Sequence, residues 1–218
     1  MSPTSEVTIR LATPADMEDI LHGFRTYYTA HEPLSGAHKI KKMTPVEEEY
    51  YMLVARKSLS LVATNPDQGG KLVGFLTCHI YTPRFDQEVA DLLAKYPPDE
   101  RFITIESIFQ KMDRETNLLE VYKVDKVFAL FSLGVDPSMR GKSIGFRLVE
   151  KALSMAQSLG CKIASVDCTS YYSAQIAQRL GMKCIHEIAY ADFVDENGEQ
   201  IFKPLPIHTH LKRFVKVF

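Results

Sequence analysis

The sequence has no excess of charge of either sign and no long apolar run. Lysine and arginine together number 26, and aspartate and glutamate 27, in 218 residues, so no overall field attracts nucleic acid or an anionic membrane surface. The longest apolar run, Val127 to Val135, has the length of a buried strand and is far shorter than the roughly 20 residues that cross a bilayer. The start of the chain is polar and lacks the apolar core of a signal peptide. We therefore expect a soluble cytoplasmic protein without nucleic-acid or membrane partners.

Cysteine is scarce, and its spacing excludes two kinds of site. The four cysteines are Cys78, Cys161, Cys168 and Cys184. They form no C-x-x-C pair of the kind that binds zinc, and a chain of this length needs no disulfide scaffold to complete its core. His208 and His210 lie two apart on an expected strand but have no third ligand. We expect four buried, reduced thiols and no metal.

Internal repeats, low-complexity tracts and flexible linkers are absent as well, so we expect a single domain over residues 1–218. At Thr13 and again at Thr44, a threonine is followed by a proline and then by an acid at the third position. This pattern is typical of a helix N-terminus. The apolar spacing after Thr13 predicts a helix that ends near Ala30.

Strands and helices alternate through the rest of the chain. Expected strands cover residues 7–11, 60–64, 72–81, 127–135, 162–168, 184–190 and 207–217, and later helices cover 141–159 and 170–180. Two amphipathic segments between residues 82 and 126 predict a helical insertion near the substrate site, a common place for a lid. This order predicts an α/β domain of three layers.

The segment from Leu133 to Gly145 joins an expected strand to an expected helix through a basic, glycine-rich turn. The free N–H groups and the positive dipole end of a helix start form an anion site. A nucleotide-binding P-loop needs a glycine at position 136, which is Asp136, and the G-x-G-x-x-G pattern is also missing. Neither of these nucleotide-binding motifs therefore explains the segment. It binds an anion of another kind, or it is a helix start without a ligand.

The same segment resembles the acetyl-CoA signature of the GNAT superfamily, Arg/Gln-x-x-Gly-x-Gly/Ala. The matching residues are Arg140, Gly141, Lys142, Ser143, Ile144 and Gly145. Ser143 replaces the first signature glycine but still offers its backbone N–H. The resemblance implies a mixed, mostly antiparallel central sheet, flanked by helices and splayed at the acetyl-CoA site, with these six residues around the diphosphate.

The GNAT resemblance also implies where the pantetheine arm lies. It assigns the strand segment Leu133, Gly134 and Val135 to the cofactor, with backbone groups of Leu133 and Val135 pairing with the arm. An N–H near Leu133 would face the thioester oxygen, where negative charge develops during attack. A separate basic cluster at Lys39, Lys41 and Lys42 is interpreted as a solvated face, with contact to the CoA 3′-phosphate as the alternative.

Three further stretches resemble the insect arylalkylamine (dopamine-type) N-acetyltransferases. They are Tyr27-Tyr28-Thr29-Ala30-His31-Glu32-Pro33-Leu34, Cys168-Thr169-Ser170-Tyr171-Tyr172-Ser173-Ala174, and Phe202-Lys203-Pro204 with Pro206-Ile207-His208. Two departures lie where the amine pocket is expected, because His31 replaces the family's aspartate and Tyr171 a common histidine. The resemblance places Tyr28, His31 and Tyr171 at the substrate.

Residue roles follow from this narrower resemblance. Glu32 matches the family's general base; the alternatives are that it binds the substrate cation or caps the neighbouring turn. Thr169 and Ser173 match serines that assist the leaving thiolate, with Ser170 and Tyr172 beside the cofactor. Ordinary N-capping is the alternative for these hydroxyls, and for Ser170 in particular.

The expected activity is acetyl transfer from acetyl-CoA to the primary amine of a small molecule. An alkylamine has a pKa near 10, so only about one molecule in a thousand is a free nucleophile at pH 7, and a proton acceptor is needed. No cysteine is placed as an acyl carrier, which favours direct attack in a ternary complex. An arylalkylamine is the expected substrate, and the enzyme is expected to be a monomer or weak dimer. The alternatives are a polyamine or other non-aromatic amine, or a non-catalytic acetyl-CoA-binding protein.

Overall fold

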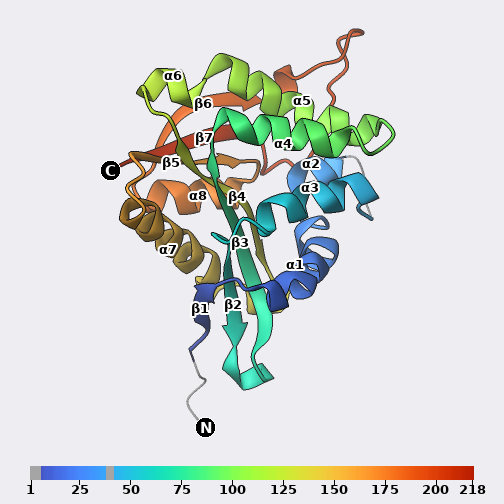
Figure 1. Ribbon diagram of the computed structural model, residues 1–218. Helices are drawn as coiled ribbons and strands as arrows, with labels where there is room; N and C mark the ends of the chain where they lie inside the picture. Colours follow the sequence, from blue (N-terminus) through green and yellow to red (C-terminus); the bar gives the residue numbers. More distant parts are fainter. Residues whose placement is uncertain (1–5, 38–41) are drawn as a thin grey trace.

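A mixed sheet with the order β1-β2-β3-β4-β5-β7-β6 forms the centre of the molecule (Figure 1). The computed structural model describes residues 6–37 and 42–218, so Lys39 and Lys41 lie outside the described residues. The strands are β1 (Thr8–Leu11), β2 (Leu61–Asn65), β3 (Lys71–Tyr81), β4 (Val127–Val135), β5 (Ile163–Cys168), β6 (Lys183–Ala189) and β7 (His210–Val217). Only β4 and β5 pair in parallel; the other neighbours are antiparallel. The predicted α/β fold is confirmed.

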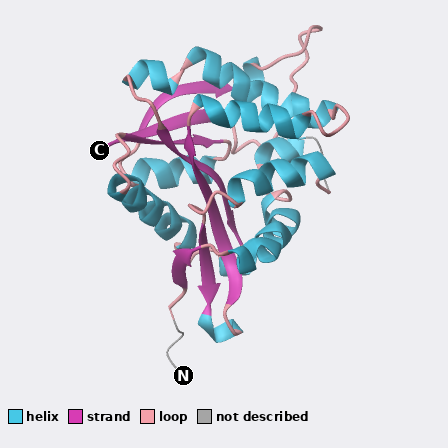
Figure 2. Cartoon of the chain, in the orientation of Figure 1, coloured by secondary structure: helices cyan, strands magenta, loops and turns pink. Residues whose placement is uncertain are grey.

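Helices cover both faces of this sheet (Figure 2). They are α1 (Met17–Gly23), α2 (Pro33–Ala37), α3 (Pro45–Ala55), α4 (Pro83–Leu93), α5 (Glu100–Glu115), α6 (Leu118–Tyr122), α7 (Ile144–Ser158) and α8 (Tyr171–Arg179). The apolar sides of α7 and α8 pack against one face, and those of α1 and α3 pack against the other. Apolar burial on both faces of the central strands explains their continuous apolar runs.

Both predicted helix starts contain a capping box. The Thr13 N–H donates to the Asp16 carboxylate at 2.7 Å, and the Thr44 N–H donates to that of Glu47 at 2.6 Å. The short 3-10 turn η1 (Pro14–Asp16) separates the first cap from α1. These local bonds satisfy N–H groups that a helix start leaves free, so the pattern correctly located the starts.

Three expected helix features differ in the structure. The first helix continues beyond α1 as a π-helical turn, η2 (Phe24–Tyr28), in which the Thr29 N–H reaches the Phe24 carbonyl at 3.0 Å. Helix α7 begins at Ile144 rather than at residue 141, because the preceding Ser143 adopts the left-handed conformation. The 82–126 insertion contains α6 as well as the two expected helices, since Asn117 caps a further short turn.

Two smaller expectations were wrong. Cys184 is exposed, unlike the other three thiols, because it lies on β6, the last strand in the order and therefore an edge. His208 and His210 do not share a strand, since β7 begins only at His210.

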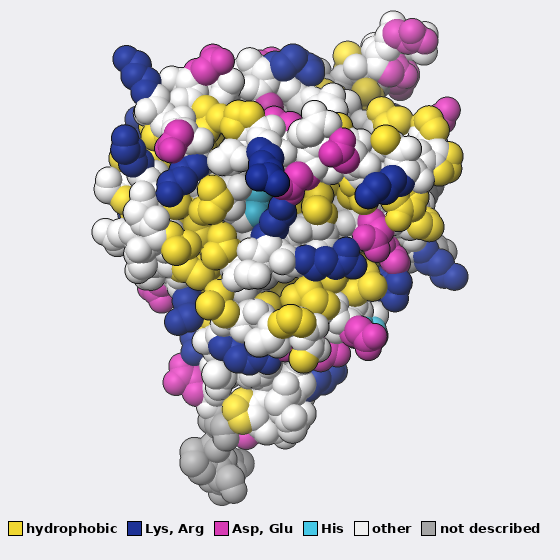
Figure 3. All heavy atoms as spheres, in the orientation of Figure 1, with side chains coloured by type: hydrophobic (Ala, Val, Ile, Leu, Met, Phe, Trp, Pro, Cys, Tyr) yellow, Lys and Arg dark blue, Asp and Glu magenta, His cyan; other side chains and the backbone are white. Residues whose placement is uncertain are grey.

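The surface in Figure 3 carries acidic and basic side chains side by side on the face shown, in keeping with the balanced composition. Over residues 6–37 and 42–218, the helices are all too short or too polar to span a bilayer.

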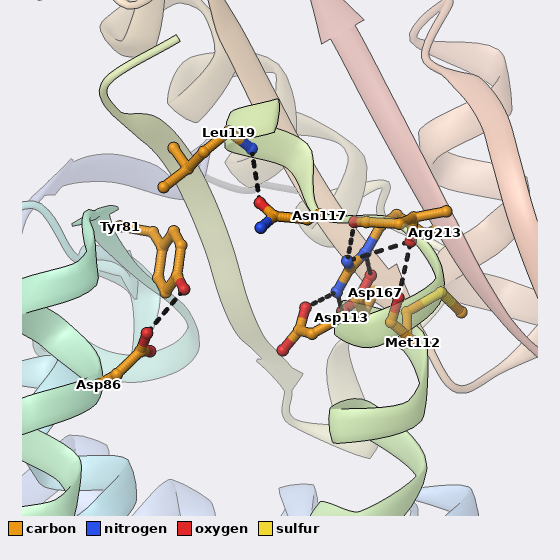
Figure 4. A network of polar contacts seen from close by, with 9 residues as sticks. Tyr81, Asp86, Met112, Asp113, Asn117, Leu119, Asp167 and Arg213 are labelled. Atoms are coloured by element: carbon orange, nitrogen blue, oxygen red, sulfur yellow. Dashed lines mark hydrogen bonds and ion pairs between the residues drawn. The ribbon is translucent and has the colours of Figure 1, made fainter. Parts of the chain in front are cut away.

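The inserted helix α5 is attached to the sheet by Arg213 of β7 (Figure 4). Arg213 is 5 % exposed, and its guanidinium makes two bonds to the Asp167 carboxylate on β5, at 2.6 and 2.7 Å. It also donates to Asp113 at 2.7 Å and to the Thr116 carbonyl at 3.0 Å, both at the C-terminal end of α5. One buried cation therefore joins two strands to the insertion.

Replacing Arg213 by alanine is expected to lower the free energy of unfolding by about 3 kcal/mol, because Asp167 would lose its partner in a buried setting. Urea unfolding followed by circular dichroism measures this loss. The matched control is Lys212→Ala, whose exposed pair with Glu187 is expected to contribute less than about 1 kcal/mol. Equal losses in the two variants would contradict the assignment.

Candidate functional site

The two parallel strands at the centre of the sheet separate after a short stretch of pairing. β4 and β5 are in register only from Phe128 to Leu130 against Ala164 to Val166. Further along β4, the Asp136 N–H bonds the Val73 carbonyl at 2.9 Å. Because antiparallel bonding alternates, the main-chain groups of Leu133 and Val135 then point away from β3, towards β5. The separation leaves these groups free to bond an extended ligand.

A small cavity of about 30 Å³ lies where the strands part. Its lining includes Leu130, Phe131, Leu133, Val166, Ser173 and Ala177. The structure thus brings together two predicted residues: Leu133, expected beside the thioester, and Ser173, expected to assist the leaving thiolate. The walls are otherwise apolar, so a bound acyl chain would be shielded from water.

A β-bulge shapes the wall of this cavity. β3 pairs Thr77 with Ser132 and Cys78 with Leu130, which makes Phe131 an extra residue of β4. The Ser132 N–H turns to the Thr77 hydroxyl at 3.1 Å instead of to a carbonyl. The bulge places Phe131 between the cavity and a group of tyrosines on the other side of β4.

The predicted diphosphate loop presents its backbone to solvent. Arg140, Gly141, Lys142 and Ser143 are exposed. Gly141 has φ +79° and Ser143 has φ +56°, so the chain reverses tightly before α7. At Gly145 an added Cβ would lie 3.3 Å from Ile176 and 3.4 Å from Leu133, so the start of α7 packs closely on β4. The helix N-terminus and the parted strands therefore lie next to each other.

Glu32 is buried and caps the helix α2. Its carboxylate accepts the N–H of Leu34 at 3.1 Å and that of Ser35 at 2.6 Å. This is the capping role that the sequence left open as an alternative, and each oxygen keeps a lone pair for a further partner. The neighbouring His31 is exposed; partial burial, and next the charge of Arg140, lower its pKa. The loop before α2 thus lies near the diphosphate loop.

Three tyrosines lie on the Glu32 side of β4. Tyr28 comes from η2, and Tyr50 and Tyr51 come from α3; we call them the tyrosine cluster. The ring centroids of Tyr28 and Tyr51 are 5.5 Å apart, and those of Tyr50 and Tyr51 are 5.8 Å apart. Burial is the largest cause that raises the pKa of all three, and the charge of Glu32 raises those of Tyr28 and Tyr51 further. The three phenols therefore remain protonated hydrogen-bond donors at neutral pH.

The tyrosine cluster is connected to the bulge and to a second carboxyl group. The Ser132 hydroxyl donates to that of Tyr28 at 3.4 Å. The Tyr50 hydroxyl donates to the Glu106 carboxyl on α5 at 3.2 Å. Two acids, Glu32 and Glu106, thus border one aromatic cluster, an arrangement that suits a cation.

The start of α8 holds the predicted hydroxyls. Ser170 is the N-cap, and its Oγ accepts the Ser173 N–H at 3.0 Å and lies 2.8 Å from the Ser173 Oγ. Thr169 is half-buried, and its carbonyl accepts the Tyr190 hydroxyl at 2.7 Å. Capping therefore uses Ser170. Ser173, whose hydroxyl donates to the Ser170 carbonyl at 3.0 Å, also lines the cavity.

The next two residues, Tyr171 and Tyr172, lie at the surface and do not line the cavity. Tyr171 is 46 % exposed and Tyr172 is 62 % exposed. The Tyr171 N–H donates to the Nδ1 atom of His208 at 3.1 Å, which connects the C-terminal segment to α8. Neither ring belongs to the tyrosine cluster at Glu32, so their predicted contacts to substrate and cofactor would have to form at the surface.

Comparison with known proteins identifies the family. Residues 18–182, well over half of the chain, match the acetyltransferase (GNAT) family. The chain belongs to the GNAT acetyltransferases. This confirms the predicted family, and with it the N-acetyltransferase class of enzyme.

Solved structures of insect GNAT enzymes are similar over nearly the whole chain. Arylalkylamine N-acetyltransferase 2 from Aedes aegypti is 28% identical with a TM-score of 0.89, over 98% of this chain and 99% of that one. A mosquito arylalkylamine N-acetyltransferase-like 5b is 26% identical with a TM-score of 0.86, over 98% and 100%. A Drosophila melanogaster polyamine N-acetyltransferase that forms N-acetylagmatine is 25% identical with a TM-score of 0.84, over 98% and 100%. The similar proteins therefore include enzymes for aromatic and for non-aromatic amines.

Sequence reasoning missed several residues of the candidate site. Tyr50, Tyr51, Ser132 and Glu106 were not among the residues predicted for it. A signal for Glu106 was present, because it interrupts the spacing of Phe102, Ile105 and Phe109 on α5, but a single acid in such a helix is ordinary. Its burial depends on a helix distant in the sequence.

Ser143→Gly is expected to raise the free energy of unfolding by about 0.5 to 1 kcal/mol, because glycine adopts φ +56° without the steric cost of a Cβ. Ser143→Ala, which also removes the hydroxyl but keeps the Cβ, is the matched control and should give no gain. Urea unfolding of the two variants makes the comparison. A gain of equal size in the alanine variant would show that the hydroxyl, rather than the backbone, carries the cost.

Proposed function

We propose that this GNAT enzyme transfers an acetyl group from acetyl-CoA to the primary amine of a small molecule, by direct attack in a ternary complex. The observation that carries the proposal is the parting of β4 and β5 beside the start of α7. An apolar cavity, unpaired main-chain groups and a helix N-terminus follow one another there, in the order that an acyl-pantetheine-diphosphate requires.

The residues around this opening fit acetyl-CoA. The exposed backbone of residues 140–143 and the dipole of α7 suit the diphosphate. Leu133 and Val135 would bond the pantetheine arm as a neighbouring strand does, and an N–H near Leu133 would face the thioester oxygen. Ser173 would hydrogen-bond the departing sulfur, with Thr169, Ser170 and Tyr172 nearby on the same helix start.

The other side of β4 supports an amine as the acceptor. We assign Glu32 to the ammonium, as the carboxylate that attracts it and holds it in position for deprotonation, with Tyr28 and His31 beside it and Tyr171 at the surface. Glu32 is well suited to holding a cation, because two backbone N–H groups fix its carboxylate in one position. Deprotonating the amine at neutral pH costs roughly 4 kcal/mol, which this side of the site must supply.

The tyrosine cluster favours an arylalkylamine, whose ring could stack on phenol rings while its ammonium faces Glu32. The second carboxyl group, Glu106, favours a substrate with two cationic groups as the second candidate. Both kinds of substrate occur among the structurally similar enzymes.

A thiol-release assay with acetyl-CoA and a panel of amines tests the function. We expect turnover with phenylethylamine-like or indole-ethylamine substrates to exceed that with agmatine or spermidine in kcat/KM. The reverse order would favour the second candidate. CoA binding without turnover on any amine would instead indicate a non-catalytic acetyl-CoA-binding protein.

Arg140→Ala is expected to weaken CoA binding about tenfold, because a charged hydrogen bond to phosphate contributes roughly 1.5 kcal/mol. Isothermal titration calorimetry with CoA measures the dissociation constant. Lys151→Ala is the matched control, since it removes one exposed positive charge from α7 further along the helix. Unchanged affinity in the Arg140 variant would remove the proposed phosphate contact.

A further inference from the structure

Glu106 is an acid in the inserted helix α5 that faces inward. The residue is half-buried, and its carboxyl group accepts the Tyr50 hydroxyl at 3.2 Å. The Tyr50 ring packs on Phe102, one turn before Glu106, with centroids 5.1 Å apart. Placing an acid against a neighbouring helix costs desolvation energy, so solubility alone does not explain why an acid is present at this position.

The surroundings of Glu106 make it able to take up a proton at neutral pH. Burial raises the pKa of its carboxyl group to about 7; the Tyr50 hydrogen bond opposes this rise, and the like charge of Asp113 adds to it. The charge of Glu106 in turn raises the pKa of two phenols on neighbouring elements, those of Tyr28 and Tyr51. A group with a pKa close to the working pH is the most effective proton acceptor.

Glu106 also lies close to the place where the amine must react. Glu32 and Glu106 act on the same two phenols, Tyr28 and Tyr51, so both carboxyl groups border the tyrosine cluster. The Tyr50 ring, whose hydroxyl donates to Glu106, lies 5.5 Å from the ring of Phe131 at the β-bulge. Phe131 in turn lines the cavity between β4 and β5. A chain of contacts therefore leads from the acyl cavity to Glu106.

We propose that Glu106 accepts the proton that the substrate ammonium loses, while Glu32 holds the ammonium in place. The proposal rests on the proposed amine acetyltransferase function. Two lone pairs of Glu32 are already used by backbone N–H groups, so its main task is to position a charge. Within the described residues, the Glu106 carboxylate accepts one hydrogen bond, from a phenol that can pass the proton on to it.

The proposed step is balanced. The ammonium gives one proton to the Glu106 carboxylate, directly or through the Tyr50 hydroxyl, and the freed lone pair forms the C–N bond with the acyl carbon. The C–S bond breaks, and its electron pair leaves with the sulfur. Two protons then remain on the nitrogen: one passes to the thiolate through the hydroxyls at the start of α8, and the product amide keeps the other. Glu106 later releases its proton to water.

The test is the pH dependence of kcat/KM for the best amine of the panel, from pH 5.5 to pH 9.5. In the wild type, kcat/KM should rise through about pH 7, as Glu106 loses its proton, and then level off below the pKa of the amine, because the ammonium is the form that Glu32 holds. Glu106→Gln should lose the rise near pH 7 and lower kcat/KM at pH 8 by about 10²-fold. Tyr50→Phe should move that rise to higher pH, because the hydrogen bond it removes lowers the pKa of Glu106.

Three further variants separate this role from others. Glu32→Gln should slow the enzyme but keep the rise near pH 7. Glu106→Asp should restore part of the rise, which excludes a folding defect as the cause of its loss. Glu100→Gln, an exposed acid on the same helix, should behave as the wild type.

Several results would overturn the proposal. One is a Glu106→Gln variant that keeps the rise near pH 7; another is a Glu32→Gln variant that loses it. A Glu106→Gln variant that only raises KM, and only for amines with a second cationic group, would show a binding role instead. A wild type that acetylates no amine would reject the proposed function itself, whereas an active wild type with an unchanged Glu106→Gln profile would reject this inference alone.

Discussion

The interrupted pairing between β4 and β5 is the constraint on which the other features depend. A sheet normally satisfies all its interior main-chain groups, and here three residue pairs do so before the strands part. Beyond these pairs, the main-chain N–H and C=O groups of β4 that face β5 can be paired by an extended, strand-like ligand. The bulge at Phe131, the close packing of Gly145 and the hydroxyl of Ser173 are all arranged around that opening. The site is therefore a property of the sheet, and individual side chains refine it.

Local rules were sufficient for most of the fold. The capping boxes at Thr13 and Thr44 marked helix starts because their bonds span only three residues. The strand at 127–135 was recognisable because both of its faces are buried. The start of α7 was misplaced by three residues because the left-handed turn at Ser143 is unusual for serine. The tight turn precedes a helix that packs closely on β4 at Gly145, a tertiary contact that no local pattern records.

In the candidate site, too, the residues in a contiguous motif could be predicted, and those brought together by tertiary packing could not. The loop from Arg140 to Gly145 is contiguous, so its motif could be recognised as one unit. Tyr50 and Glu106 are 56 positions apart in the chain, and their hydrogen bond exists only because α3 and α5 pack together. Glu106 is buried only through tertiary packing. The apolar spacing of α5 does not distinguish it from the other acids of the helix. Glu32 shows the intermediate case, because its motif was visible but its two backbone partners were not.

The place of β7 in the sheet has a consequence for how the molecule is assembled. β7 follows the other strands in chain order, yet it lies between β5 and β6. During synthesis β6 can find no neighbour until β7 has emerged, and α5 must wait equally long for Arg213. Helix α5, which carries Glu106, would thus be secured in the last stage of folding. A nascent chain halted before β7 would expose the edge of β5, where the strand of another chain could pair.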